Sequence, residues 1–339
     1  MKHLAVTLVA LWTVCCSVVW QVEAASDVFI TPPYGPLRLV NQHPVQLLFL
    51  QSFPEEVNVT PPGHVGVHLN VALTNTLLRQ EQNFTADLDL EMVRTVIDVR
   101  YGVRPDFEMG LELPLLYTYG GILDDVVLRI ERFPLAGNPR ALRRKQVPGQ
   151  VTYRVLRDQR LFIQGQDDAL GLGDVVLKAK ALLLREQELF PAVSLRAALK
   201  FPSGDTSRAF GSGEIDGGFG VLLQKTLGRW TFYVNGDVTF PGQAFNDVDV
   251  SLQPFFSGVF AIEYRLLKPL SMVVQLHGDT RPFYGTVPVL DKRLIETLLG
   301  ANWALSRRLV LQVGLADDVF DSACCAADIT FFANLTGRW

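Results

Sequence analysis

The sequence predicts an all-β protein, a closed antiparallel transmembrane β-barrel of about twelve strands. Apolar residues make up 48% of the 339 residues, yet beyond residue 20 they form no uncharged run of about 18 residues, the length of a membrane-spanning helix. They alternate instead with polar residues at a period of two, which puts the two kinds on opposite faces of a strand. Short and long connections also alternate, as they do in outer-membrane barrels.

The chain begins with the pattern of an export signal. An apolar stretch covers residues 4–20, and Val22 and Ala24 occupy the small-residue positions before a cleavage site. We therefore assign residues 1–24 to a signal peptide, with a single membrane anchor helix as the alternative. An exported chain with a barrel pattern is expected in the bacterial outer membrane.

Residues 25–62 form a proline-rich segment of a different character. The prolines are Pro32, Pro33, Pro36, Pro44, Pro54, Pro61 and Pro62. Proline has no backbone N–H to donate, so this density forbids a regular β-ladder. We expect an irregular segment, placed either on the periplasmic side or as a plug inside the barrel, with an extra strand as a third possibility. Its one apolar run, Val45 to Leu50, would anchor it.

The barrel itself is assigned to residues 63–339. Alternation is clear over residues 65–74, 93–101, 107–117, 174–181, 193–201, 230–238, 270–277, 308–315 and 329–339. In the second of these segments, Val93 and Val99 share one face, and Arg94, Asp98 and Arg100 share the other. Less regular strands are expected over 213–227, 253–266 and 294–305. Most of these segments reach the roughly 9–11 residues that a tilted strand needs to cross a bilayer.

The connections fall into two classes by length. Short ones are predicted near residues 104–105, 187–189, 228–229, 267–268 and 306–307, and long ones near 77–90, 118–170, 202–212, 242–252, 282–292 and 317–327. Short turns are typical of the periplasmic side and long loops of the outer side. Both chain ends are therefore expected on the periplasmic side.

The second long loop carries a helical pattern. Ile122, Val126, Ile130 and Phe133 recur at a spacing of three to four residues, and Pro134 ends the pattern. We predict a short helix there. A basic run follows, at Arg140, Arg143, Arg144 and Lys145, which either forms a solvated loop or meets lipopolysaccharide phosphates by charge attraction.

Charged residues of both signs fall on the face predicted to line the lumen. They are Arg94, Asp98, Arg100, Glu112, Lys178, Lys180, Arg196, Lys200, Asp216, Asp237, Glu263, Arg265, His277, Asp279 and Glu296. Opposite charges on neighbouring strands would pair and stiffen the barrel, or else would select solutes. A lumen of mixed sign does not indicate an ion-selective porin.

An enzyme is the least favoured class. Some outer-membrane barrels hydrolyse acyl chains at the rim, and Ser257, His277 and Asp279 are the candidate residues for that chemistry. A GxSxG motif is absent from the sequence, and we expect no catalytic residue. Neither a metal nor a cofactor is expected, because the cysteines and histidines lack ligand spacing. Cys324 and Cys325 are adjacent, and their role stays open. The net charge of -4 does not indicate nucleic-acid binding.

Two segments carry a family resemblance. The first is Asn-Gln-His-Pro-Val-Gln-Leu-Leu-Phe-Leu at residues 41–50, and the second is Leu-Lys-Phe-Pro-Ser-Gly-Asp at 199–205, followed by Gly-Ser-Gly at 211–213 and Lys-Thr-Leu-Gly-Arg-Trp at 225–230. Together they resemble the bacterial outer-membrane family called domain of unknown function 3187. The second segment is also similar to outer-membrane proteins named for the meta-pathway of phenol degradation. The resemblance implies an outer-membrane barrel without assigned site residues, and the phenol label implies at most transport of small aromatics.

These observations favour a passive channel or transporter for small solutes, which the resemblance suggests are hydrophobic or aromatic. A structural or surface-interaction barrel with a plugged lumen is the alternative, and a rim acyl-hydrolase comes third. Outer-membrane lipid and lipopolysaccharide are the expected surroundings. The C-terminal strand, ending at Trp339, resembles the aromatic terminal signature by which the barrel assembly machinery recognises its substrates.

Overall fold

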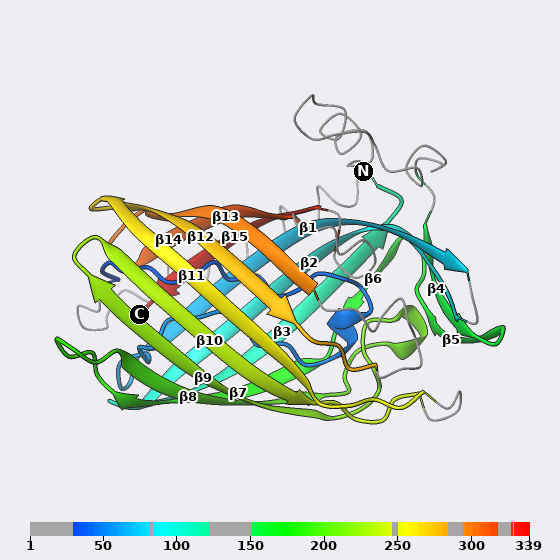
Figure 1. Ribbon diagram of the computed structural model, residues 1–339, viewed down its shortest axis with the longest axis horizontal. Helices are drawn as coiled ribbons and strands as arrows, with labels where there is room; N and C mark the ends of the chain where they lie inside the picture. Colours follow the sequence, from blue (N-terminus) through cyan, green and yellow to red (C-terminus); the bar gives the residue numbers. More distant parts are fainter. Residues whose placement is uncertain are drawn as a thin grey trace.

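The computed structural model describes residues 30–81, 84–121, 149, 151–245, 250–283, 294–317, 327 and 329–339. Twelve of its strands close into an antiparallel barrel, which confirms the predicted fold class (Figure 1). The predicted signal peptide, the helix predicted near residues 122–133, the basic run after it, and Cys324 and Cys325 lie outside the described residues.

Each barrel strand pairs with the next barrel strand along the chain. β3 is followed in this order by β7, because the three short strands between them in the sequence are not part of the barrel. The barrel strands are β1 (Val65–Glu81), β2 (Phe84–Arg104), β3 (Phe107–Tyr119), β7 (Val175–Leu184), β8 (Ala192–Phe201), β9 (Asp216–Leu227), β10 (Trp230–Phe240), β11 (Phe255–Leu267), β12 (Leu270–Asp279), β13 (Leu294–Ala304), β14 (Leu309–Asp317) and β15 (Ile329–Arg338). The last strand pairs with the first, from Gly66 opposite Arg338 to Asn75 opposite Ile329. Trp339 completes the closure by exchanging two backbone hydrogen bonds with Val65, of 2.7 and 2.9 Å.

The prediction of a long loop over residues 77–90 is wrong. β1 and β2 stay paired as far as Glu81 opposite Thr85 and project beyond the other strands (Figure 1). β4 (Thr152–Arg157) pairs with this extension of β2, and β5 (Arg160–Gln164) pairs with β4. β6 (Ala169–Leu172) pairs with the outer part of β3. β4 and β5 lie within the interval 118–170 that was predicted only as a loop with a helix, and β6 begins at the end of that interval.

The inward face of β2 changes character where the strand leaves the barrel. Within the barrel, Arg94, Asp98 and Arg100 point inward, whereas on the extension the same side carries Leu88 and Leu90, which are fully buried. A strand inside a bilayer turns its apolar side to lipid, whereas a strand in water turns it to a protein core. The switch in β2 therefore places the edge of the membrane near residues 92–93.

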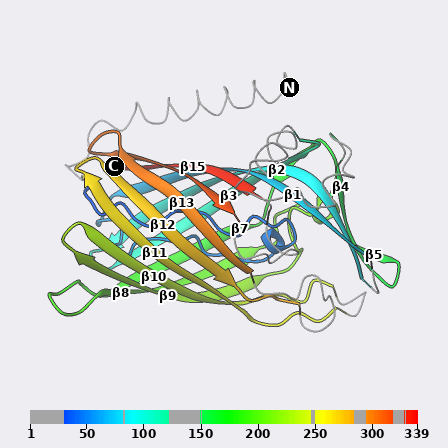
Figure 2. The ribbon, with the colours of Figure 1, turned by 45° about the horizontal axis from the view of Figure 1, so that its top comes forward.

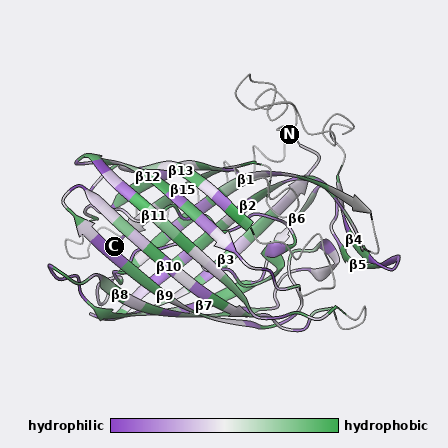
Figure 3. Ribbon diagram, in the orientation of Figure 1, coloured by the Kyte–Doolittle hydropathy of each residue, from purple (hydrophilic) through white to green (hydrophobic). Residues whose placement is uncertain are grey.

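The outer surface of the barrel is a belt of exposed apolar side chains. It includes Leu177, Leu199, Phe219, Val234, Phe260, Met272, Val274, Leu299 and Val313. Figure 3 shows apolar and polar residues alternating along the barrel strands. A continuous apolar surface of this extent is unsuited to water and suited to lipid. Within the described ranges, no helix is long and apolar enough to cross a membrane.

Residues 30–64, which we call the luminal segment, run inside the barrel (Figures 1 and 2). The segment starts at the end with the short turns, where the Ile30 N–H donates to the carbonyl of Arg307 over 2.7 Å. It crosses to the end with the long loops, makes a 3-10 turn, η1 (Gln46–Leu48), and returns. The Gly63 N–H then bonds the carbonyl of Gly102 over 2.8 Å, directly before β1 begins.

Candidate functional site in the barrel lumen

The first leg of the luminal segment is held by side-chain amides of the barrel wall. Gln275 accepts from the Leu37 N–H at 2.9 Å and donates to the Leu37 carbonyl at 3.1 Å. Gln312 accepts from the Arg38 N–H at 2.6 Å and donates to the Pro36 carbonyl at 3.0 Å. An amide offers both a donor and an acceptor, so it can replace the ladder that the prolines prevent.

The returning leg is held in the same manner by other wall residues. The bonds join Leu50 N to Asp216 (2.8 Å), Thr239 to the Leu50 carbonyl (3.2 Å), Lys200 to the Leu48 carbonyl (2.9 Å), Glu55 N to Asn235 (2.8 Å), Ser194 to the Val57 carbonyl (2.7 Å) and Thr60 N to Glu108 (2.6 Å). All these bonds run from a wall side chain to the segment's backbone. Between its two ends the luminal segment is thus bonded to the wall through side chains rather than through a backbone ladder. Near its C-terminal end it forms one isolated bridge, between Pro62 and Gly102.

A buried ion network connects the wall to the segment. Arg100 lies at its centre, 2.8 Å from Asp98 and 2.9 Å from Glu108. Asp98 also pairs with Lys178 at 2.9 Å and with Arg38 of the luminal segment at 2.7 Å. Lys178 additionally pairs with Glu112. Charges at this depth are tolerated because each has an opposite charge in contact.

Glu55 is the carboxylate that the luminal segment contributes to this network. Its oxygens lie 2.9 Å from Arg100, 2.9 Å from Arg196 and 3.2 Å from Lys180. Glu55 is therefore bound by three cations at once.

A second group of charges lies toward the end with the long loops. Lys200 pairs with Asp174 at 2.6 Å and with Asp216 at 3.3 Å. Arg94 has its guanidinium 5.3 Å from the centre of the Phe53 ring, a cation–π contact with the luminal segment.

The charged residues that the sequence placed in the lumen are gathered there, with one exception. Arg265 is only half-buried and lies at the short-turn end, where it donates to the carbonyl of Gly228 over 3.3 Å. The others are buried or nearly so, and Arg94, Asp98, Arg100, Glu112, Lys178, Lys180, Arg196, Lys200, Asp216, Asp237, Glu263, His277, Asp279 and Glu296 all line the inside of the barrel.

The residues considered for hydrolysis are arranged as an ion pair. The Nε2 atom of His277 lies 3.1 Å from Asp279, and Nδ1 lies 3.7 Å from Glu296. Ser257 stands opposite Asp279 in the β11–β12 register, whereas His277 stands opposite Val259. A nucleophilic serine needs the imidazole itself as its hydrogen-bond partner. Both ring nitrogens of His277 face carboxylates instead, so the geometry gives no support to this alternative.

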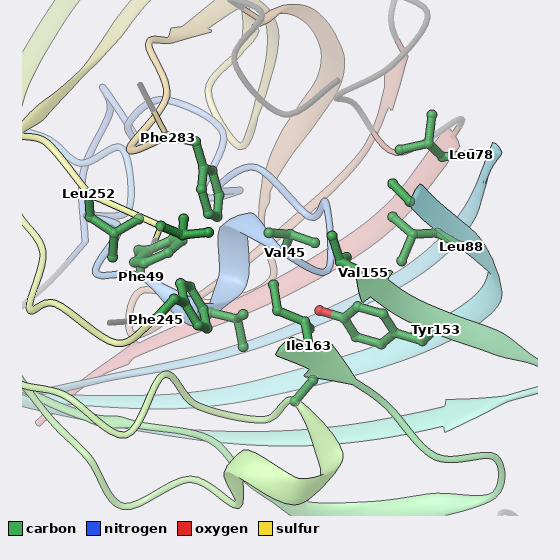
Figure 4. Close-up of a cluster of buried hydrophobic side chains, with 14 of the residues drawn as sticks. Val45, Phe49, Leu78, Leu88, Tyr153, Val155, Ile163, Phe245, Leu252 and Phe283 are labelled. Carbon is green, nitrogen blue, oxygen red and sulfur yellow. The ribbon is translucent and has the colours of Figure 1, made fainter. Parts of the chain in front are cut away.

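An apolar cluster surrounds the tip of the luminal segment at the end with the long loops (Figure 4). Phe49, just after η1, contacts the rings of Phe245, Phe255 and Phe283, with centroids 6.4, 6.4 and 5.7 Å away. The cluster continues through Leu78, Ala86, Leu88 and Leu90 of the β1–β2 extension and through Tyr153, Val155 and Ile163 of β4 and β5. The tip of the luminal segment is therefore anchored in an apolar cap.

Small cavities lie beside the described luminal segment, including one of about 30 Å³ next to Pro32 and Pro33. Another of about 40 Å³ is bordered by Tyr34, Glu56, His68 and Arg338, and one of about 30 Å³ by Gln51, among others. Spaces of this size hold water molecules rather than a solute. Within the described part of the chain, no group of three His, Cys, Asp or Glu side chains is placed to hold a metal ion.

Sequence reasoning missed the amide residues that bind the luminal segment and also missed Glu55 and Arg38. Gln275, Gln312 and Asn235 occupy inward positions of the same alternation that placed the charged residues, so they carried a signal. The sequence holds no such signal for Glu55 and Arg38, because they lie in a segment without periodicity.

The comparisons with known proteins agree with this architecture. A family model described as a protein of unknown function, DUF3187, matches residues 10–339. The chain belongs to this family. No curated protein matches the DUF3187 chain in sequence.

Among solved structures, an outer membrane channel from Pseudomonas putida F1 is similar to this DUF3187 protein, with 14% identity and a TM-score of 0.56 over 85% of this chain and 100% of that chain. The NanC porin has 8% identity and a TM-score of 0.46, over 80% of this chain and 98% of that chain. The first likeness shows that the two chains share an outer-membrane-type barrel fold.

Proposed function

We propose that this protein is a passive channel of the bacterial outer membrane whose lumen is gated by the luminal segment. One observation carries the proposal: the strand ladder closes between β1 and β15 without the segment, which is bonded to the wall through side chains between its two ends and through backbone at those ends, next to Arg307 and Gly102. The part between the ends can therefore leave or shift while every strand pairing of the barrel stays intact. Movement of the segment would open a polar passage between the two ends of the barrel.

The chemistry of the wall supports a state filled with water. A core that stays permanently dry is at least as stable with apolar residues of similar volume, because buried ion pairs repay little of their desolvation. Here the wall carries Arg100, Lys180, Arg196 and their carboxylate partners next to the luminal segment. Such residues suit a surface that is covered by the segment in one state and by water in another.

The solutes are proposed to be small. The resemblance to proteins named for phenol degradation suggests hydrophobic or aromatic compounds, whereas the charged wall favours polar ones. A structural barrel with a permanent plug is the second candidate, and the dense bonding of the luminal segment is the observation that favours it.

The surroundings of the barrel are proposals as well. The apolar belt supports contact with outer-membrane lipid, and lipopolysaccharide would lie at the end with the long loops. The barrel assembly machinery would recognise the terminal strand, which ends at Trp339.

Conductance across a planar bilayer tests the proposal. The refolded full chain is compared with a variant in which residues 30–62 are replaced by a Gly/Ser linker of equal length. We expect rare or small steps from the full chain and frequent larger steps from the variant. If neither form shows conductance steps, although circular dichroism shows that the variant is folded, an ion-conducting pore is excluded and the structural barrel is favoured.

A further inference from the structure

The contact between Glu55 and the wall has the form of a ligand in a binding site. Arg100 comes from β2, Lys180 from β7 and Arg196 from β8, and the three converge on one carboxylate. We call these three residues the Glu55 site. A guanidinium is a planar donor that matches a carboxylate well, and two of the three residues are arginines.

The site is organised by the wall rather than by its ligand. Arg100 is fixed by Asp98 at 2.8 Å, Lys180 by Glu108 at 3.1 Å, and Arg196 by Asp237 at 2.5 Å. These partners belong to the barrel strands, so they stay in place when the luminal segment moves. The three cations would then keep their positions and face an unoccupied lumen.

The strand register gives an independent reason for an anion at this place. Lys180 and Arg196 stand directly opposite each other in the β7–β8 ladder. Like charges in directly opposite positions repel and destabilise a sheet unless an opposite charge lies between them. Glu55 contacts both cations while the segment is inside, whereas Glu108 and Asp237 leave each of them a single wall carboxylate once the segment has left.

We propose that the Glu55 site is the carboxylate-binding site of the channel, and that its solutes are small organic acids whose carboxylate replaces Glu55. This inference rests on the proposed function and names its solute class. The luminal segment then acts as a built-in competitor, because Glu55 occupies the site whenever the lumen is filled. Asn235, whose amide bonds the Glu55 backbone N–H at 2.8 Å and its carbonyl at 3.3 Å, would contact a polar group next to the solute's carboxylate.

Chemical rescue in the full chain tests the binding site directly. Glu55→Ala removes the carboxymethyl group and leaves a space that acetate fits. We expect acetate to raise the unfolding temperature of Glu55→Ala in a saturable manner and to leave the wild-type protein unchanged. Acetamide, which has the same shape without the charge, should have no effect.

The matched control is Glu56→Ala, because Glu56 is the neighbouring carboxylate and its ion pair among the described residues is with Arg338. Acetate should bind this variant at least about tenfold more weakly than it binds Glu55→Ala, a factor that corresponds to about 1.4 kcal/mol. Equal responses to acetate and acetamide in Glu55→Ala would overturn the proposal. If Glu55→Ala does not fold by itself, its refolding yield is compared in acetate and in acetamide, and equal yields would likewise overturn the proposal.

Uptake into liposomes separates this inference from the proposed function. Full-chain Glu55→Ala should admit succinate faster than erythritol, an uncharged four-carbon solute, and adding Arg196→Gln should remove that preference. Passage of both solutes at equal rates would keep the channel and reject its solute class. Acetate rescue without any uptake would keep the binding site and reject the channel.

Discussion

At the scale of single residues, the lumen depends on ions that share partners. Arg100 contacts Asp98, Glu55 and Glu108, so its loss would leave three carboxylates without their common cation. Removing one partner from a buried ion pair typically costs about 3–5 kcal/mol, because the remaining charge stays buried. We expect Arg100→Met to lower the free energy of unfolding by an amount in that range, measured by urea titration of the protein in detergent.

The control for this prediction is Arg104→Met on the same strand. Arg104 is exposed and lies 3.8 Å from Asp106, also exposed, and such surface pairs contribute about 0–1 kcal/mol. Similar losses in the two variants would show that the network contributes no more than a surface pair.

His43, at the tip of the luminal segment, predicts a pH dependence. Burial, and then the nearby Arg281, lower its pKa from an ordinary 6.5 to about 3, and both ring nitrogens lack a hydrogen-bond partner among the described residues. The unfolded chain therefore binds a proton on His43 at a higher pH than the folded chain does. Stability from the neutral imidazole is fully present above pH 6.5 and is lost as the pH falls toward 3.

We expect acidification below pH 6.5 to loosen the tip of the segment, which can be measured as faster proteolysis of residues 30–62 in the intact protein. His43→Leu should flatten this dependence between pH 6.5 and 4, and His64→Leu, near the short-turn end, should leave it unchanged. An unchanged slope in His43→Leu would remove His43 as its cause.

The identity of the inward residues could be read from the sequence, but their partners could not. Alternation places Arg100, Lys180 and Arg196 on one face of their strands because side chains of a strand point to alternate sides. Their shared partner, Glu55, lies in an aperiodic segment, and only the folded barrel brings it to them. The pairing of Ser257 with His277 could not be judged from the sequence for a similar reason, since strand register decides which residues touch, and it places Ser257 opposite Asp279.

At the scale of elements, the strands were predictable where they face lipid on one side and the lumen on the other. The sequence analysis missed the extension of β1 and β2, although polar and apolar residues alternate there too. The reason is that the apolar residues of the extension lie on the face that carries the polar residues within the barrel. Leu88 and Leu90 fall on the same side as Arg94 and Asp98, so the alternation slips at the membrane edge. β4, β5 and β6 contain only 6, 5 and 4 residues and depend on that extension for pairing.

The apolar cap gives a prediction for the 3-10 turn. Phe49 is buried among Phe245, Phe255 and Phe283, and truncation of a buried phenylalanine to alanine typically costs about 3–5 kcal/mol. We expect Phe49→Ala to release the tip of the luminal segment, so that the full chain shows more frequent conductance steps. Phe256→Ala is the control, because that ring is 61% exposed on the outside of the barrel. Equal step frequencies in the two variants would show that the cap does not hold the segment.

At the scale of the whole molecule, the barrel is closed by its last residues. β15 pairs with β1, and Trp339 exchanges two backbone hydrogen bonds with Val65. We expect deletion of Trp339 to reduce the amount of folded barrel in the outer membrane several-fold, measured by heat-modifiable migration in gels. Trp303→Ala, which removes an exposed outward ring of β13, is the control for the loss of an aromatic alone. Full assembly without Trp339 would contradict the proposed recognition.

The class of fold, the strand count and the family followed from pattern and resemblance, since a closed barrel imposes period two on every strand. The path of residues 30–64 did not follow, because proline density only says what the segment cannot form. Its course is set by the positions of Gln275, Gln312 and Asn235 on three different strands.

Both ends of the luminal segment lie at the short-turn mouth, next to Arg307 and Gly102. The segment is thus a loop that enters and leaves the barrel at the same end. It can be withdrawn without a chain end passing through the lumen. A pull applied at Ile30 would load the bonds of the first leg one after another, starting with those nearest the mouth. Extraction would then break the bonds one at a time, at a low and nearly constant force. A strand whose bonds were all loaded together would instead resist with a single high force peak.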